Sequence, residues 1–211
     1  MDIIQFLREK SLLILPILVA VTFHEVAHGM VAYKLGDTTA KDAGRLTLNP
    51  IKHLDLFGSL VFIITGIIGW AKPVPVNPSK LKNPKKDMMW VSLAGPAANI
   101  VIAILMAVVL RLLLQPLSVQ SFFDVRILFP ILTMLKIGVI MNIGLAIFNA
   151  IPVPPLDGSK ILMGLLPLKQ AIAFSKLEPY GIFILLILIM TDIVDYTIAP
   201  VIHILVKVLL P

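Results

Sequence analysis

Two histidines and a glutamate stand within five consecutive residues of the chain, in the sequence His24-Glu25-Val26-Ala27-His28. In a helix, residues four positions apart lie on the same face, so both imidazoles could reach one ion. Glu25 lies beside them, where it could accept a proton from a water held at that ion. This HExxH spacing is typical of zinc hydrolases, in which the glutamate acts as the general base.

The chain offers few other groups that could bind a metal, because it has no cysteine and only four histidines in 211 residues. The missing cysteine excludes disulfides, iron–sulfur clusters, thiolate metal sites and a cysteine nucleophile. A tetrahedral catalytic zinc held by two histidines needs one more protein ligand and a water. That ligand must be an oxygen or a distant histidine, and the leading candidate is Asp157, near the end of the stretch NAIPVPPLDG that begins at Asn149.

The composition places these groups in a membrane protein. The chain is 58% hydrophobic and 14% charged, with a mean hydropathy of +0.98, whereas soluble domains are about 45–50% apolar and about 25% charged. A soluble enzyme, a disordered chain and a nucleic-acid-binding protein are therefore excluded as likely classes. The net charge of +6 is explained by short basic loops between spans, the pattern of the positive-inside rule.

Four apolar runs are long enough to cross a hydrocarbon core, which takes about 20 residues. We therefore predict an all-α polytopic membrane protein with about four transmembrane helices, forming one membrane-embedded domain over residues 1–211. No secretory signal peptide is expected, because Asp2 and Glu9 are acidic and no cleavage site follows the first run. The last stretch, 198–210, is too short to assign. The four runs are 11–33, 88–114, 127–151 and a run that begins at residue 180 and is interrupted by Asp192 and Asp195.

The apolar run 56–71 is short for a span and rich in glycine and β-branched residues. If it enters the bilayer and returns, more of the lysines and arginines fall on one side than if it crosses, which favours the re-entrant arrangement. Such a segment must bury its backbone polar groups against protein, and its composition suits a strand as well as a helix. We expect a short re-entrant β-like segment at about 56–76. The same charge pattern puts the site toward the cytoplasmic face of the membrane. We expect that membrane to be a prokaryotic plasma membrane.

This topology bears on the role of the stretch around Asp157. Its prolines end the preceding span, and Gly158 frees the backbone just after the carboxylate. Alone, this stretch would be interpreted as a proline-rich turn. On the same face of the membrane as His28, it supplies the ligand that the site lacks.

HEVAH in a first span together with NAIPVPPLDG after a later span resembles the site-2 protease family of intramembrane zinc metalloproteases, in its compact form without PDZ or CBS modules. The similarity covers about residues 20–165. It implies that His24, His28 and Asp157 bind one zinc ion, that Glu25 activates water and that Asn149 contacts the substrate or the developing oxyanion. Three further stretches are similar to this branch of the family: AGRLTLNP from Ala43, GWAKPVPVN from Gly69 and AGPAAN from Ala94.

The resemblance implies hydrolysis of a peptide bond within or near a transmembrane helix of a client membrane protein. The expected partners are that client and the lipid bilayer, with no nucleic acid; the client and the oligomeric state stay open. Two other classes remain as alternatives, a metal or ion transporter with a site at mid-membrane and an inactive relative that only binds membrane segments. A transporter does not explain why Glu25 lies between two ligand-spaced histidines.

Three residues outside the main motifs also carry expectations. His53 is expected to make loop hydrogen bonds, with an auxiliary role in the site as the alternative. Gly95 lies in a small-residue stretch that lets helices approach closely. Asn99, in the same stretch, could instead turn toward the site.

Overall fold

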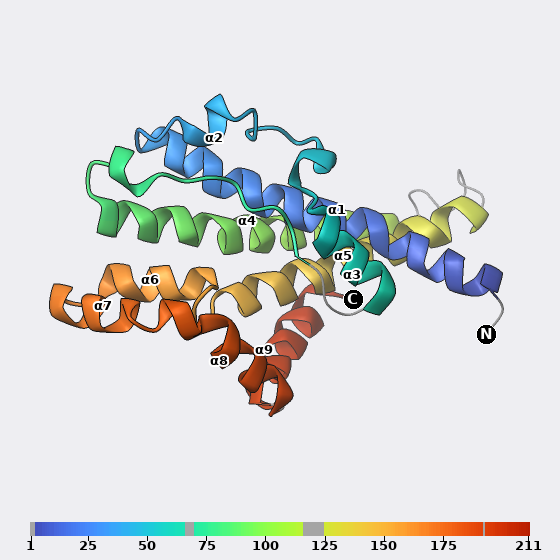
Figure 1. Ribbon diagram of the computed structural model, residues 1–211. Helices are drawn as coiled ribbons and strands as arrows, with labels where there is room; N and C mark the ends of the chain where they lie inside the picture. The colour runs from blue at the N-terminus through green and yellow to red at the C-terminus, as the bar shows by residue number, and fades with distance from the viewer. Residues whose placement is uncertain (1–2, 66–69, 116–124, 192) are drawn as a thin grey trace. The chain divides into compact units, whose positions relative to one another are not determined.

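The computed structural model describes residues 3–65, 70–115, 125–191 and 193–211, and within these ranges the side chains of 3–10, 62–65, 194 and 195 are left undescribed. The described residues form helices joined by loops, and they contain no β-strand (Figure 1). The elements in chain order are α1 (Ile3–Lys34), α2 (Thr39–Asp42), η1 (Pro50–His53), α3 (Leu56–Thr65), η2 (Pro78–Lys80), α4 (Pro84–Leu113), α5 (Val125–Asn149), α6 (Asp157–Leu165), α7 (Leu168–Ser175), η3 (Glu178–Tyr180), α8 (Gly181–Met190) and α9 (Ile193–Leu209).

Four stretches of helix are long and apolar enough to cross a membrane, as the sequence predicts. They are Ser11–Lys34, Pro84–Leu113, Val125–Asn149 and Leu168–Met190. The fourth begins at Leu168, earlier than the predicted residue 180. A shorter apolar helix, Tyr196–Leu209, contains all but the last residue of the stretch 198–210 that the sequence left unassigned. Asp192 and the side chain of Asp195, predicted to interrupt the last run, lie outside the described residues.

The β-like conformation expected for 56–76 is wrong for its first half, because Leu56–Thr65 is the helix α3. The helix is started by Asp55, whose Oδ1 accepts a hydrogen bond of 2.8 Å from the backbone N–H of Gly58. This cap satisfies a helix N–H group, and the β preference of the branched residues that follow is weak and depends on context. Beyond the undescribed residues 66–69, the chain is extended and makes one isolated antiparallel bridge, between Leu54 and Ala71.

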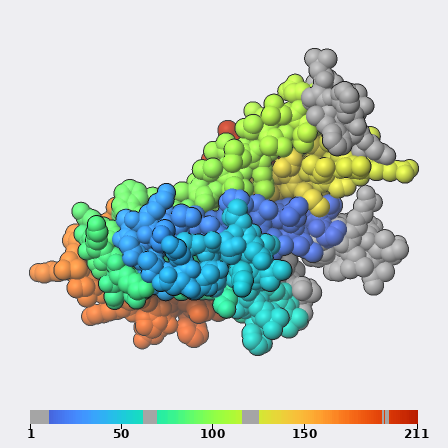
Figure 2. All heavy atoms as spheres, turned by 90° about the horizontal axis from the view of Figure 1, so that it is seen from above, coloured from blue at the N-terminus to red at the C-terminus, as the bar shows by residue number. Residues whose placement is uncertain are grey.

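The chain divides into two compact units. The first consists of Met1–Ala20, Asn99–Phe148 and Ile187–Pro211, and the second of Val21–Ala98 and Asn149–Leu186. Every residue predicted for the site belongs to the second unit. In that unit, the residues between α1 and α3 lie beside the segment that leads into α4 (blue to cyan and green in Figure 2).

Two fully buried asparagines link three helices in the first unit. The Nδ2 of Asn99, on α4, donates to the backbone oxygen of Ala20, on α1, at 2.9 Å and to Oδ1 of Asn142, on α5, at 2.8 Å. The Nδ2 of Asn142 donates to the backbone oxygen of Gly138 at 2.8 Å. Interhelical amide bonds of this kind hold membrane helices together where the hydrophobic effect between them is weak.

Asn99→Ala is expected to destabilise the protein by about 1 kcal/mol, because it removes the hydrogen bond that Oδ1 of Asn142 accepts from Asn99 in a buried place. Thermal unfolding in detergent measures the change. Thr133→Ala serves as the control, since its exposed hydroxyl bonds only to its own helix at Phe129 and its loss should leave the unfolding temperature unchanged. An unaltered unfolding temperature for Asn99→Ala would show that these bonds contribute nothing to stability.

Candidate active site

Three potential metal ligands converge in the second unit. His24 and His28 lie one turn apart on α1, and their Nε2 atoms are 3.0 Å from each other. The Oδ2 atom of Asp157, the first residue of α6, is 3.2 Å from both Nε2 atoms. Both imidazoles are buried. These are the described side chains that could together hold a metal ion, and they are the three that the sequence predicts.

The donor set fits zinc. The Oδ2 atom of Asp157 is buried without a hydrogen bond of good geometry, although two imidazole nitrogens lie 3.2 Å away. Lone pairs that point at a common centre repel one another unless a cation lies there. In a tetrahedral zinc site with bonds of about 2.0–2.1 Å, ligand atoms are roughly 3.3 Å apart, close to the spacing found here. Two imidazoles and one carboxylate with a position left open are the ligands of catalytic zinc.

A backbone carbonyl orients one of the imidazoles. The Nδ1 atom of His28 is 2.6 Å from the backbone oxygen of Val91, on α4. Because a carbonyl oxygen can only accept, Nδ1 carries the proton, and Nε2 of the neutral ring is left with its lone pair toward the other two donors. Hydrogen bonds of this kind fix the tautomer and ring orientation of metal-ligating histidines.

The carboxylate of Asp157 is ionised at neutral pH. Burial raises the pKa of this group, but the neighbouring imidazoles of His24 and His28 lower it by more, so the pKa lies well below its usual range. Asp157 is therefore in the charge state that metal ligation requires.

Glu25 and Asn149 line the same cavity as the three donors. The cavity has a volume of about 440 Å³ and is walled by α1, α4, α6, the end of α5 and the extended segment 73–78. The Oε2 atom of Glu25 accepts a hydrogen bond of 2.7 Å from the backbone N–H of Val74. All five residues that the sequence singled out thus lie around one space large enough for a peptide group and water.

Glycine at position 95 lets α4 approach the two imidazoles. A Cβ atom at Gly95 would lie 2.6 Å from Cε1 of His28 and 2.7 Å from Cε1 of His24, closer than such atoms ever come. The packing interpretation of the small-residue stretch is therefore confirmed at this residue.

Gly95→Ala should displace both imidazoles and lower bound zinc and catalytic activity at least tenfold, because adding even one methyl group to a filled space costs about 1–3 kcal/mol. The matched control is Gly144→Ala on α5, where a Cβ would have nothing within 4 Å. Zinc per chain and unfolding temperature, measured for both variants, separate a local from a global effect. Wild-type zinc content in Gly95→Ala would contradict the close approach.

Two other sequence interpretations have clear outcomes. His53 is fully buried, and its Nε2 lies 2.8 Å from the backbone oxygen of Thr47, so the loop hydrogen bond is confirmed. Asn99 is not among the residues that line the cavity and bonds to Ala20 and Asn142, so the alternative in which it turns toward the site is wrong.

The sequence did not identify Val74 and Val91 as site residues. Both act through backbone groups, an N–H on Glu25 and a carbonyl on His28, and backbone groups leave no residue-type pattern. For Val74, the available signal was its place in the stretch GWAKPVPVN.

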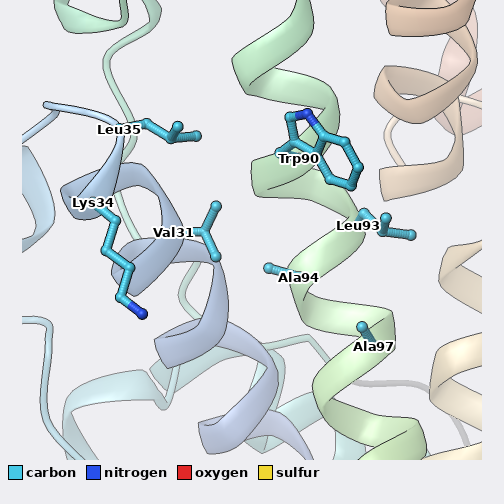
Figure 3. Close-up of a pocket in the computed structure, with 7 residues that line it drawn as sticks. All are labelled: Val31, Lys34, Leu35, Trp90, Leu93, Ala94 and Ala97. Carbon is cyan, nitrogen blue, oxygen red and sulfur yellow. The ribbon is translucent and has the colours of Figure 1, made fainter.

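A second pocket in this unit, of about 420 Å³, lies between α1 and α4 (Figure 3). Val31 of α1 faces Ala94 of α4 across it, and Lys34 is the one charged residue that lines it. The residues lining it include no carboxylate or imidazole, so their side chains do not match the donor set of a catalytic zinc site.

Comparison with known proteins gives the class and then the family. The family model "Peptidase family M50" matches residues 12–129 and 125–191. The chain is 38% identical over 195 residues to "Putative zinc metalloprotease YwhC" of Bacillus subtilis (strain 168), covering 90% of this chain and 85% of that protein. It is 28% identical over 178 residues to "Putative zinc metalloprotease Rip2" of Mycolicibacterium smegmatis, covering 82% of this chain and 64% of that protein.

A third relative is "Zinc metalloprotease MJ0392" of Methanocaldococcus jannaschii, 27% identical over 160 residues, which are 75% of this chain and 35% of that protein. No solved structure matches. The class is therefore that of zinc metalloproteases with helices of membrane-spanning length. The chain belongs to peptidase family M50, the site-2 protease family, and its cofactor is zinc.

Proposed function

We propose that the chain hydrolyses a peptide bond within or near a transmembrane helix of a client membrane protein. In this proposal, His24, His28 and Asp157 hold one zinc ion and Glu25 is the general base. The observation that carries it is the convergence of three donor atoms within 3.2 Å of one another in a cavity that also contains Glu25.

Zinc bound there would acidify a water molecule and polarise the scissile carbonyl. Glu25 would act as the general base, taking a proton from water and later delivering it to the leaving amine. The N–H of Val74 holds one oxygen of Glu25, so the second oxygen is available for the proton. Asn149, on the cavity wall, supplies an amide that can donate to the developing oxyanion.

The proposed setting is the plasma membrane of a prokaryote, with one membrane-embedded domain and the site toward the cytoplasm. Lys34 ends α1, and His28 precedes it by six residues, or about 9 Å along a helix. This depth is inside the bilayer but within reach of water from the nearer face. The positive-inside rule supports the orientation, because the loops on that side carry most of the basic residues.

Removal of the metal provides the first test. Purified protein, reconstituted with candidate single-span membrane proteins, should cleave one of them. A chelator should stop cleavage, and added zinc should restore it. Cleavage that persists without zinc would contradict the proposal. Zinc-loaded protein that cleaves no client but carries the ion across vesicle membranes would instead favour the transporter.

A further inference from the structure

The extended residues 72–77, which we call the strap, connect the bridge at Ala71 to η2 and pass along the site cavity. We propose that the strap positions the carboxylate of Glu25 for proton transfer, and that Asp37 and Arg45 are positioning residues that hold the strap at its two ends. The inference rests on the proposed function, since it assigns these residues a part in the same reaction.

The middle of the strap lies directly on the catalytic face of α1. The N–H of Val74 donates to Oε2 of Glu25 at 2.7 Å, and a hydrogen bond to a carboxylate is about twice as strong as one between neutral groups. The buried Val74 side chain lies over Gly29, one turn beyond Glu25, where a Cβ would be 2.9 Å from its Cγ1. Glycine at position 29 thus allows the contact that brings the Val74 amide to the carboxylate.

The first end of the strap is fixed by an arginine and a loop carbonyl. The Nη2 of Arg45, a largely buried residue, donates to the backbone oxygen of Lys72 at 2.7 Å. The N–H of Lys72 donates to the backbone oxygen of His53 at 2.9 Å. Both backbone groups of Lys72 are therefore held by the loop that follows α1.

The second end is fixed by a buried carboxylate. Oδ2 of Asp37, which is fully buried, accepts a 2.6 Å hydrogen bond from the N–H of Asn77, and its Oδ1 accepts bonds from the N–H and hydroxyl of Thr39 at 3.0 and 2.5 Å. Burial raises the pKa of Asp37, but the bonds from Thr39 and Asn77 and the charge of Lys80 lower it by more, so the pKa lies below its usual range. The Asp37 carboxylate, which anchors this end of the strap, is therefore charged at neutral pH.

Between its anchors the strap is stiff. Pro73 and Pro75 flank Val74; each locks its own φ, and each favours an extended conformation in the residue before it. Neither proline has an N–H, so Val74 presents a single amide at a fixed place. The terminal torsion of a glutamate side chain is soft, and this amide supplies the restraint that keeps one carboxylate oxygen engaged and the other available.

The sharpest test removes the backbone N–H of Val74 from the strap. Val74→Pro deletes the N–H while keeping the extended backbone that the neighbouring prolines already impose. Val74→Ala keeps the N–H and loses only the side chain. With zinc-loaded protein and a cleaved client, kcat should fall at least about tenfold further for Val74→Pro than for Val74→Ala, with bound zinc and KM similar in the two variants. Equal kcat values for the two variants would overturn the proposal.

The Asp37 carboxylate is tested by Asp37→Asn, which replaces one of its two acceptor oxygens with an NH2 group, so that the side chain can no longer accept from the N–H groups of both Asn77 and Thr39. The control is Thr39→Ala, which leaves the Asn77 bond intact. Asp37→Asn should lower kcat at least about fivefold at unchanged zinc content, and Thr39→Ala should remain near wild type. A kcat for Asp37→Asn equal to that of Thr39→Ala would overturn the role of the anchor.

A measurement without client or turnover separates this inference from the proposed function. The strap has amide hydrogens only at Lys72, Val74, Val76 and Asn77, so hydrogen exchange of a peptide covering it reports on few sites. In Glu25→Ala, exchange within this peptide should be faster than in wild type. Unchanged exchange would overturn the contact, whereas a wild-type protein that cleaves no client would instead count against the proposed hydrolase.

Discussion

Glu25→Gln is expected to lower client cleavage by about 100- to 10,000-fold while the protein retains its zinc. The range is the usual contribution of a general base, and the loss arises because an amide cannot take a proton from water. The variant keeps the size of the side chain. Its amide oxygen can still accept from the N–H of Val74, which in the wild type donates to Oε2 of Glu25 at 2.7 Å. The three candidate zinc ligands are untouched.

The measurement pairs client fragments, separated on a gel, with metal analysis of the same preparation. Glu178→Gln is the matched control, because Glu178 begins the short helix η3, is exposed and lies outside the site cavity. It should cleave at the wild-type rate. Cleavage by Glu25→Gln at a rate near wild type would show that another group is the base and that the hydrolase mechanism proposed for this cavity is wrong.

Asp157→Ala is expected to reduce zinc affinity by more than about 100-fold. Losing a partner that only orients a ligand already costs 10- to 100-fold, and here the ligand oxygen itself is removed. The two imidazoles would remain 3.0 Å apart with no carboxylate oxygen beside them to bind the ion. Competition with a chelator of known affinity measures the change, and cleavage should fall with zinc occupancy.

Asp42→Ala is the control for this variant, since Asp42 is an exposed aspartate outside the site cavity whose Oδ2 accepts from the nearby hydroxyl of Thr38. Asp157→Asn serves as a second variant that keeps the volume at the start of α6. Wild-type zinc affinity in both Asp157 variants would place the third ligand elsewhere in the chain.

The cluster on α1 was predictable because its five residues are local. A helix brings positions 24 and 28 to one face whatever surrounds it, and the structure places their Nε2 atoms in contact range. The prediction of Asp157 as a ligand depended on three further arguments: the absence of cysteine, the need for a third ligand and a topology that returns the chain to the same face of the membrane. That the structure brings Asp157 to both imidazoles agrees with this chain of inference.

The conformation of residues 56–65 and the start of the last span could not be derived from residue types. The branched residues after Asp55 favour a strand by propensity, yet one side-chain cap on Gly58 starts a helix there, and local propensity is weaker than such capping and tertiary contacts. The last span was predicted to begin too late, because the lysines and the proline before Tyr180 read as a polar connection. In the structure, α7, η3 and α8 and the two residues between α7 and η3 form one helical stretch long enough to cross a membrane.

The hydrogen bond between His28 and Val91 joins residues 63 positions apart in the chain, and Asp157 follows much later still. The metal site is therefore assembled only after most of the polypeptide has been made and packed, although HEVAH is present from the first span. Tight zinc capture should consequently mark the end of folding, since ligands brought together by tertiary structure couple metal binding to the folded state. Zinc stoichiometry can then serve as a quality test for each preparation of the protein, including variants altered far from the site.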